Sequence, residues 1–292
     1  MKPLKIVVFC LVMTVITAIS WMVGTMVGNG IVGTVTPPVE DPGMAGLAFL
    51  AVCAFNSILY AVLIGSTRSW YGNRRMMALI IYVFTVQFLL PQMETFFFAS
   101  AINIGYDQAW AIFISGTIVS LTTTPLAVIL YEKLASKPAI PKQVQISIAN
   151  GKKFSLLAAL LIIVGYPLLY LTFGYFIAWQ NENLRVYYTG SAELASYGHQ
   201  LSDSFSSGVY FFQILRGAIW IAATIPVAMM LKEKPAVQYF VVGTLSALLP
   251  TCLLFIPNPF MPWDIAMTHF VETSTSNFVW GMLMVWAIKN LQ

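Results

Sequence analysis

Charged residues are scarce in this chain. Asp, Glu, Lys and Arg make up 9% of its 292 residues, whereas 59% are hydrophobic. A soluble protein of this length cannot bury that much apolar surface, so the composition argues against a soluble globular protein and predicts a polytopic membrane protein. The longest hydrophilic stretches, near 137–153 and 179–207, are too short to form a soluble domain with its own core.

Cysteine and the common catalytic motifs are equally sparse. Cys10, Cys53 and Cys252 all lie in apolar segments and form no CxxC pair, which favours a packing role. The sequence has no GxxxxGK[ST] loop and no GxSxG motif. The formal net charge of +4 is spread over short loops. These features give no support to nucleotide hydrolysis, soluble redox chemistry or nucleic-acid binding.

Long apolar runs are abundant instead. Eight segments are long enough to cross a bilayer, because about 20 helical residues span its hydrocarbon core. They lie near residues 4–27, 44–65, 76–100, 109–131, 154–178, 208–231, 236–256 and 263–288. Backbone groups that face lipid must be satisfied within their own segment, so each is expected to be a helix. We therefore predict an all-α, polytopic integral membrane protein with about eight transmembrane helices, the first retained as a span rather than cleaved as a signal sequence.

The basic residues indicate the orientation of these helices. In an eight-helix arrangement, 13 of the 15 Lys and Arg residues fall on one side, in the terminal segments and in alternate loops. They are Lys2, Lys5, Arg68, Arg74, Arg75, Lys133, Lys137, Lys142, Lys152, Lys153, Lys232, Lys234 and Lys289. The positive-inside rule then places both termini in the cytoplasm. The predicted location is the plasma (cytoplasmic) membrane, with the lipid bilayer as the main partner; the oligomeric state is not predicted.

Four ionisable residues are placed inside otherwise apolar segments: Glu94, Arg216, His269 and Glu272. Such residues are costly in a membrane and usually face a bundle interior or a water-filled cavity. The predicted topology puts all four in the outer half of the bilayer, about 6–14 Å below its outer boundary at 1.5 Å per helical residue. A shared depth is required if the four are to meet.

Helical periodicity groups further polar residues with these four. His269, Glu272, Thr273 and Ser276 share one face of the last segment. Gln213 shares a face with Arg216, and Gln87 shares one with Pro91 and Glu94. We expect segments 76–100, 208–231 and 263–288 to build a polar cavity that opens outward, with Arg216 flanked by Glu94 and Glu272 and with His269 nearer the outer water.

Three functions fit such a cluster. It can bind or transport a small polar or charged solute, or protons. It can belong to an intramembrane enzyme acting on a lipid-like substrate or head group, with Glu94, His269 and Glu272 holding a divalent metal. It can also be a structural ion-pair cluster in a subunit of a larger complex. Solute or proton binding is the leading interpretation; the enzyme and structural readings stay open.

The segment 179–207 is the remaining candidate for specificity. It lies on the predicted outer side and is rich in Tyr, Ser and Gly. Aromatic residues are common at membrane interfaces in any case. The segment is therefore interpreted either as a linker or as a short amphipathic lid over the cluster. His199, which lies in this segment, is interpreted as a solvated loop histidine and not as a further metal ligand.

Overall fold

The computed structural model describes residues 2–102, 104–135, 151–232 and 234–289. Lys137 and Lys142, two of the predicted loop cations, lie outside these ranges. Within them the chain is helical apart from turns and one isolated bridge between Asn258 and Met261. The elements are α1 (Pro3–Val32), α2 (Pro42–Ser66), α3 (Gly72–Val83), η1 (Phe84–Leu89), α4 (Leu90–Phe97), α5 (Tyr106–Leu134), α6 (Gly151–Leu160), η2 (Leu161–Gly165), α7 (Tyr166–Phe176), η3 (Ala178–Gln180), α8 (Glu182–Thr189), α9 (Tyr197–Ser206), α10 (Val209–Met230), α11 (Pro235–Thr251), η4 (Cys252–Phe255) and α12 (Trp263–Lys289).

The predicted all-α fold is confirmed. Seven described helical segments are long and apolar enough to cross a membrane by length and composition: Pro3–Val32, Pro42–Ser66, Gly72–Phe97, Tyr106–Leu134, Leu156–Gln180, Val209–Met230 and Pro235–Phe255. The predicted eighth segment is the helix α12, which has 27 residues. It is absent from the seven because polar residues in its first half and at its middle, among them Glu272 and Asn277, lower its mean hydropathy.

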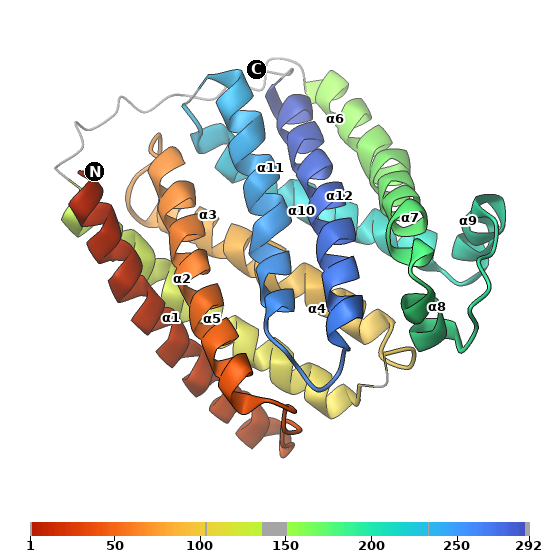
Figure 1. Cartoon of the computed structure of the whole chain (residues 1–292). Coiled ribbons are helices and arrows are strands. Elements are labelled where there is room, and N and C mark those ends of the chain that lie inside the picture. The colour runs from red at the N-terminus through yellow and green to blue at the C-terminus, as the bar shows by residue number, and fades with distance from the viewer. Residues whose placement is uncertain (1, 103, 136–150, 233, 290–292) are drawn as a thin grey trace.

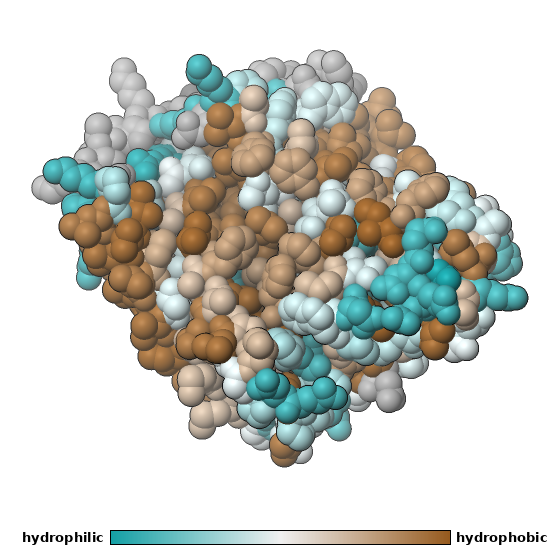
Figure 2. Space-filling view, in the orientation of Figure 1, coloured by the Kyte–Doolittle hydropathy of each residue, from teal (hydrophilic) through white to brown (hydrophobic). Residues whose placement is uncertain are grey.

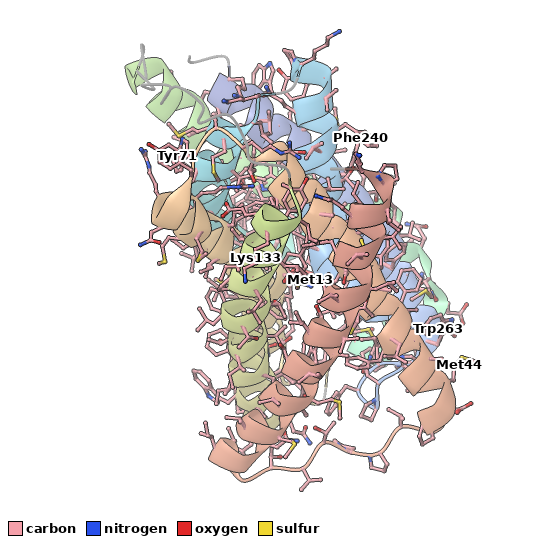
Figure 3. All side chains as sticks on the ribbon, turned by 90° about the vertical axis from the view of Figure 1, so that its left-hand side faces the viewer. Met13, Met44, Tyr71, Lys133, Phe240 and Trp263 are labelled. Atoms are coloured by element: carbon pink, nitrogen blue, oxygen red, sulfur yellow. The ribbon has the colours of Figure 1, made fainter. Side chains whose placement is uncertain are left out.

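The long helices pack side by side in one bundle (Figure 1). α11 and α12 form an antiparallel hairpin in front, α1 and α2 lie to one side, and α6 and α7 lie to the other. The turns alternate between two ends of the bundle. Figure 3 shows Met44 and Trp263, at the starts of α2 and α12, toward one end, and Tyr71 and Phe240 toward the other. We call the first the α8 end, because α8 lies there, and the second the Arg75 end.

Small residues allow two pairs of helices to approach closely. A Cβ on Gly24 of α1 would lie 2.9 Å from the carbonyl oxygen of Ser115 on α5, and the Ser115 hydroxyl donates to the Gly24 carbonyl at 3.0 Å. Gly243 of α11 and Gly281 of α12 meet in the same way, since a Cβ on Gly281 would lie 2.8 Å from the Gly243 Cα. Such small-residue contacts are typical of helices packed inside a membrane.

Two stretches of π-helix, η1 and η2, lie just before a proline. Pro91 and Pro167 each follow the π-helix by two residues. A proline in a helix lacks an N–H and its ring clashes with the carbonyl four residues earlier. In η1 the wider turn shifts the hydrogen bonds to a five-residue spacing, as the bond from the Leu90 N–H to the Thr85 carbonyl shows. The extra residue changes the face on which the following side chains lie.

At the Arg75 end, basic side chains form hydrogen bonds that connect neighbouring helices. Sequence reasoning placed Arg75 in a loop, but it lies in the first turns of α3 and its side chain is only 7% exposed. It donates to Glu132 of α5 at 3.0 Å and to the Ile64 carbonyl of α2 at 2.5 Å. Arg68 donates to the Tyr131 hydroxyl at 2.7 Å. These bonds tie α2, α3 and α5 together at one end.

Apolar side chains cover the flank of the bundle seen in Figure 2, over α1, α2 and α11. Hydrophilic side chains gather over α8 and at the ends of the helices. Many large apolar residues on the long helices are exposed, including Leu4, Met26 and Leu47. In water these would form an aggregation-prone surface. This distribution is what a bilayer-facing surface requires.

Candidate functional site

An arginine and a glutamate from different helices form an ion pair inside the bundle. Nη1 of Arg216, on α10, donates to Oε1 of Glu94, on α4, at 2.5 Å. The same nitrogen donates to Oε1 of Gln213, one turn earlier, at 2.8 Å. The Arg216 guanidinium also lies 5.9 Å from the ring centre of Tyr166 and 5.7 Å from that of Phe212. A carboxylate, an amide and two aromatic rings therefore surround this cation.

A second acid–base pair lies on α12. Nδ1 of His269 is 3.5 Å from Oε2 of Glu272, and the Thr273 hydroxyl donates to the same carboxylate oxygen at 2.8 Å. The other ring nitrogen of His269, Nε2, is 2.9 Å from the phenolic oxygen of Tyr188 on α8. Both nitrogens of the imidazole thus have a partner, one acidic and one neutral.

The two pairs belong to one electrostatic cluster. The charges of Glu272 and His269 both act on Glu94, and Glu94 and Glu272 both act on Tyr170 of α7. Charges interact strongly in a buried setting, where the effective dielectric constant is well below that of water. The structure therefore brings together the four ionisable residues that the sequence pattern selected. We call Glu94, Arg216, His269 and Glu272 the charged cluster.

The cluster is largely buried but still reaches the surface. The side chains of Arg216 and Glu272 are 5% and 7% exposed, whereas those of Glu94 and His269 are 30% and 23% exposed. One member of each ion pair is thus hidden and the other is accessible. Glu94 and His269 are therefore the members of the cluster that a group outside the bundle can contact.

Two details differ from the sequence prediction. Arg216 was expected between Glu94 and Glu272, but Glu272 instead pairs with His269. Gln87 was expected beside Glu94, but its amide donates to Asn56 of α2 at 2.9 Å. The cause of the second difference is η1, whose extra residue disrupts the α-helical register between Gln87 and Glu94. The simple 3.6-residue periodicity therefore does not hold across Pro91.

The remaining predicted polar residues lie as follows. Gln213 contacts Arg216 and Thr273 contacts Glu272, as given above. Ser276 is buried and donates to the Thr273 carbonyl of its own helix at 3.2 Å. His199 is outside the cluster, on α9, where Nε2 lies 3.2 Å from the carboxylate of Asp203 and both side chains are exposed.

Three tyrosines that lie beside the charged cluster were not predicted from the sequence. Tyr166 lies against Arg216, and Tyr188 contacts His269. Tyr170 lies within electrostatic range of the Glu94 and Glu272 carboxylates. Tyrosines are frequent in membrane helices, so their identity alone carries little information. The available signal was their position: Tyr166 and Tyr170 are four residues apart on either side of Pro167.

The predicted outer segment 179–207 contains two short helices, α8 and α9, of which α8 is firmly attached. The Asn181 side chain donates to the Thr268 hydroxyl at 2.7 Å, and Asn183 donates to Asp264 at 2.8 Å. The Tyr187 hydroxyl donates to the Phe260 carbonyl at 2.6 Å. α8 therefore behaves as a cap fixed to the start of α12, and it holds Tyr188 over His269.

A divalent metal site finds no support in this geometry. Among the residues that the structure describes, no group of three His, Cys, Asp or Glu side chains is arranged to hold a metal ion. Glu94 is engaged with Arg216, and both nitrogens of His269 already have partners. The proposed ligand set Glu94, His269 and Glu272 is thus divided between two ion pairs.

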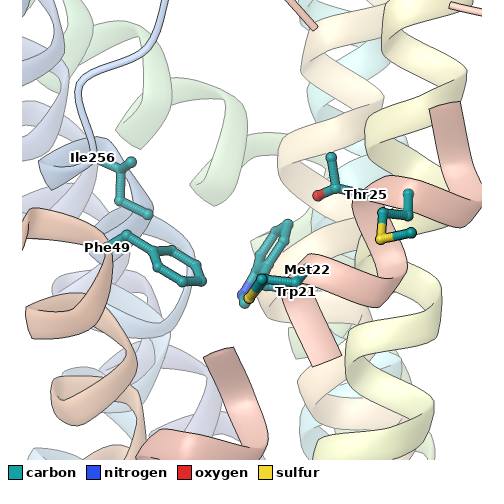
Figure 4. Close-up of a pocket in the computed structure, with 6 residues that line it drawn as sticks. Trp21, Met22, Thr25, Phe49 and Ile256 are labelled. Atoms are coloured by element: carbon teal, nitrogen blue, oxygen red, sulfur yellow. The ribbon is translucent and has the colours of Figure 1, made fainter. Parts of the chain in front are cut away.

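A separate apolar hollow of about 480 Å³ lies away from these charges, between α1 and α2 (Figure 4). Its walls are Trp21, Met22, Thr25, Met26, Phe49 and Ile256. Thr25 is the single hydroxyl among these residues. The hollow therefore has the chemistry of a lipid-facing groove and not that of a site for a charged solute.

The chain matches no protein-family model, no curated protein and no solved structure. Its function must therefore be argued from the charged cluster itself.

Proposed function

We propose that this protein binds a small charged solute at the charged cluster and that a proton on the cluster accompanies this binding. The protein crosses the cytoplasmic membrane eight times, with α12 as the eighth span, both termini in the cytoplasm and the α8 end outside. The observation that carries the proposal is the pairing of Arg216 with Glu94 and of His269 with Glu272 inside one cluster.

The charges of the cluster do not balance when His269 is neutral. Two carboxylates and one guanidinium then leave one negative charge in surroundings that tolerate it poorly. A proton on the imidazole or a bound ligand that brings positive charge removes this imbalance. Histidine side chains ordinarily titrate near neutral pH, which suits them to this role.

A purely structural role explains the cluster less well. A buried ion pair is often no more stabilising than apolar residues of the same size, and polar contacts between membrane helices contribute only about 1 kcal/mol. The cluster combines two such pairs, and Nε of Arg216 is buried without a hydrogen-bond partner. A ligand group that accepts hydrogen bonds would satisfy this donor.

The test is a thermal-shift measurement on the full chain in lipid nanodiscs. The probes are succinate, alanine and spermidine, which represent an anion, a zwitterion and a cation. We expect one probe to raise the melting temperature with a saturating dependence on its concentration, and to do so differently at pH 5.5 and pH 8.

The control is the double variant Glu94→Gln/Arg216→Gln. It removes both charges of one pair, so neither is left buried and alone, and the fold is retained. We expect it to melt cooperatively and to show no shift with any probe. If no probe shifts the wild-type protein at either pH, or if the double variant responds like the wild type, the proposal is wrong.

A further inference from the structure

A stripe of polar atoms without hydrogen-bond partners runs along one face of α10. Among the described residues, the atoms are Nε2 of Gln213, Nε of Arg216, Nε1 of Trp220 and Oγ1 of Thr224. All four side chains are at least 95% buried. We call these four residues the α10 stripe.

The spacing of the α10 stripe makes it continuous. The residues follow one another at i, i+3, i+7 and i+11, which is a single face of an α-helix. At 1.5 Å per residue the stripe extends about 16 Å along the helix axis. It begins at the charged cluster, of which Arg216 is a member, and continues toward the Arg75 end. More than half the thickness of a bilayer core is covered in this way.

Neighbouring helices add polar groups beside the stripe. Nε1 of Trp280, on α12, is also buried without a partner. The rings of Trp220 and Trp280 both contact Tyr166, with ring centres 5.9 and 4.8 Å away. On α3, which packs against α10, the Tyr82 hydroxyl lies close to Ser246 of α11. Polar groups from α3, α10, α11 and α12 therefore line the inside of the bundle.

Unpartnered polar groups in such a position are costly. Each one loses its hydrogen bonds to water, at a cost of about 1–3 kcal/mol. Four such atoms share one helix face and a fifth lies on the adjacent helix α12, whereas most buried polar groups in proteins have a partner. Ordered water is the usual partner of buried polar groups that do not bond to protein, and one molecule bonds to two to four of them.

The packing around the stripe is too tight for a solute larger than water. The Tyr166 ring lies directly on the backbone of α10, so that a Cβ added to Gly217 would be 3.1 Å from it. Trp220 and Trp280 are both at most 1% exposed, and both rings pack against this ring. An amino acid or a dicarboxylate is too large for such packing, so single water molecules are the partners that we expect for the unpartnered groups.

We infer that the α10 stripe lines a file of water molecules that carries protons between the charged cluster and the Arg75 end of the bundle. This inference rests on the proposed function, since it supplies the route for the proton that accompanies the solute. The proton enters at the exposed members of the cluster, Glu94 or His269. Each water then accepts one proton and releases one to the next, so that no net charge remains on the route.

The water itself is tested by X-ray radiolysis of the wild-type protein in nanodiscs, which oxidises side chains beside bound water. We expect Trp220 and Trp280 to be oxidised in spite of their burial. Met13 and Phe9 are the controls, because they are 0% exposed and belong to the same buried core but have no polar side-chain atom that needs a partner; they should remain unmodified. Unmodified Trp220 and Trp280 would overturn the water file, whatever the charged cluster binds.

Proton conduction is tested in liposomes that contain a pH-sensitive dye and carry a potassium diffusion potential. Thr224→Val removes one hydroxyl with little change in shape, and Trp220→Phe removes one N–H together with part of the indole ring. Each is expected to lower the proton flux on the order of tenfold. The matched controls are Trp263→Phe, at an exposed position, and Thr122→Val, whose hydroxyl already bonds to the Ile118 carbonyl; both should conduct as the wild type does.

The two proposals fail separately. Both stripe variants keep the charged cluster, so they should still show the thermal shift of the wild type with the active probe. Unchanged flux in Trp220→Phe and Thr224→Val would overturn the proton route and leave solute binding standing. If instead no probe shifts the melting temperature of the wild-type protein, the proposed function is overturned.

Discussion

The phenolic oxygen of Tyr188 lies 2.9 Å from Nε2 of His269, and this contact joins the cap helix α8 to the charged cluster. Burial raises the pKa of the Tyr188 phenol above its ordinary value of 10.0. The phenol therefore remains protonated at neutral pH. It can donate to a neutral imidazole or accept from a protonated one, so that the contact persists in both states of His269.

We expect Tyr188→Phe to change the stability of the protein in two ways. Loss of the hydrogen bond should cost about 1 kcal/mol at neutral pH. In the wild type, a pKa raised by folding gives stability that is complete below pH 10 and is lost as the pH rises further. Thermal melts from pH 7 to 11 should therefore show a shallower alkaline decline in the variant. Tyr71→Phe, at an exposed position, is the control and should keep the wild-type decline.

The proline that follows η1 should determine where Glu94 points. Without the ring of Pro91, the helix can return to regular α-helical hydrogen bonding, and Glu94 then turns away from Arg216. Pro91→Ala should therefore abolish the probe-induced thermal shift without unfolding the protein. Pro125→Ala is the matched control, because Pro125 lies inside α5, a continuous α-helix. Equal probe responses in both variants would contradict this role of η1.

Periodicity and hydropathy predict most of this fold, because a long helix in lipid needs only apolar residues and its own hydrogen bonds. All eight apolar segments are helices, and α1 extends beyond its predicted end to Val32. The π-helices are harder to predict. Membrane helices tolerate proline in several ways, and the choice of a π-turn before Pro91 depends on packing. The sequence left a linker and a short amphipathic lid equally open for 179–207, where α8 and α9 lie, because short amphipathic helices carry little apolar signal.

The charged cluster is predictable in its members and not in its pairing. Buried charges stand out in an apolar sequence, which is why Glu94, Arg216, His269 and Glu272 could be selected. Which acid pairs with which base depends on the rotation of each helix, and η1 alters one of these rotations. The α10 stripe escaped notice because Trp220 and Thr224 are ordinary in a membrane helix; only the lack of a partner makes them informative.

The contact between α1 and α5 gives a prediction with an internal control. A Cβ on Gly28 would overlap the Ala111 carbonyl and lie 2.7 Å from the Ser115 hydroxyl, whereas one on Gly30 would meet nothing within 4 Å. Gly28→Ala should destabilise the protein by about 1–3 kcal/mol through overpacking. Gly30→Ala should be neutral or stabilising by up to about 1 kcal/mol, because alanine favours the helix. Chemical denaturation in detergent micelles compares the two, and equal losses would contradict close helix packing at Gly28.

The number of spans is decided by α12, whose polar first half sets it apart from the seven other long helices. The charged cluster lies in that half, where it is shielded by α4, α7, α8 and α10, while the second half is apolar enough to face lipid. We therefore expect α12 to cross, which places both termini on the same side.

In a cysteine-free background, Glu40→Cys and Ser191→Cys should react with an impermeant maleimide in intact cells, and Asn73→Cys and Lys232→Cys should react only after lysis. Epitope tags at the two termini should both be protected in intact cells. If the C-terminal tag is accessible while the N-terminal tag is protected, α12 does not cross, and Glu272 must then reach Glu94 from a helix that lies outside the bilayer.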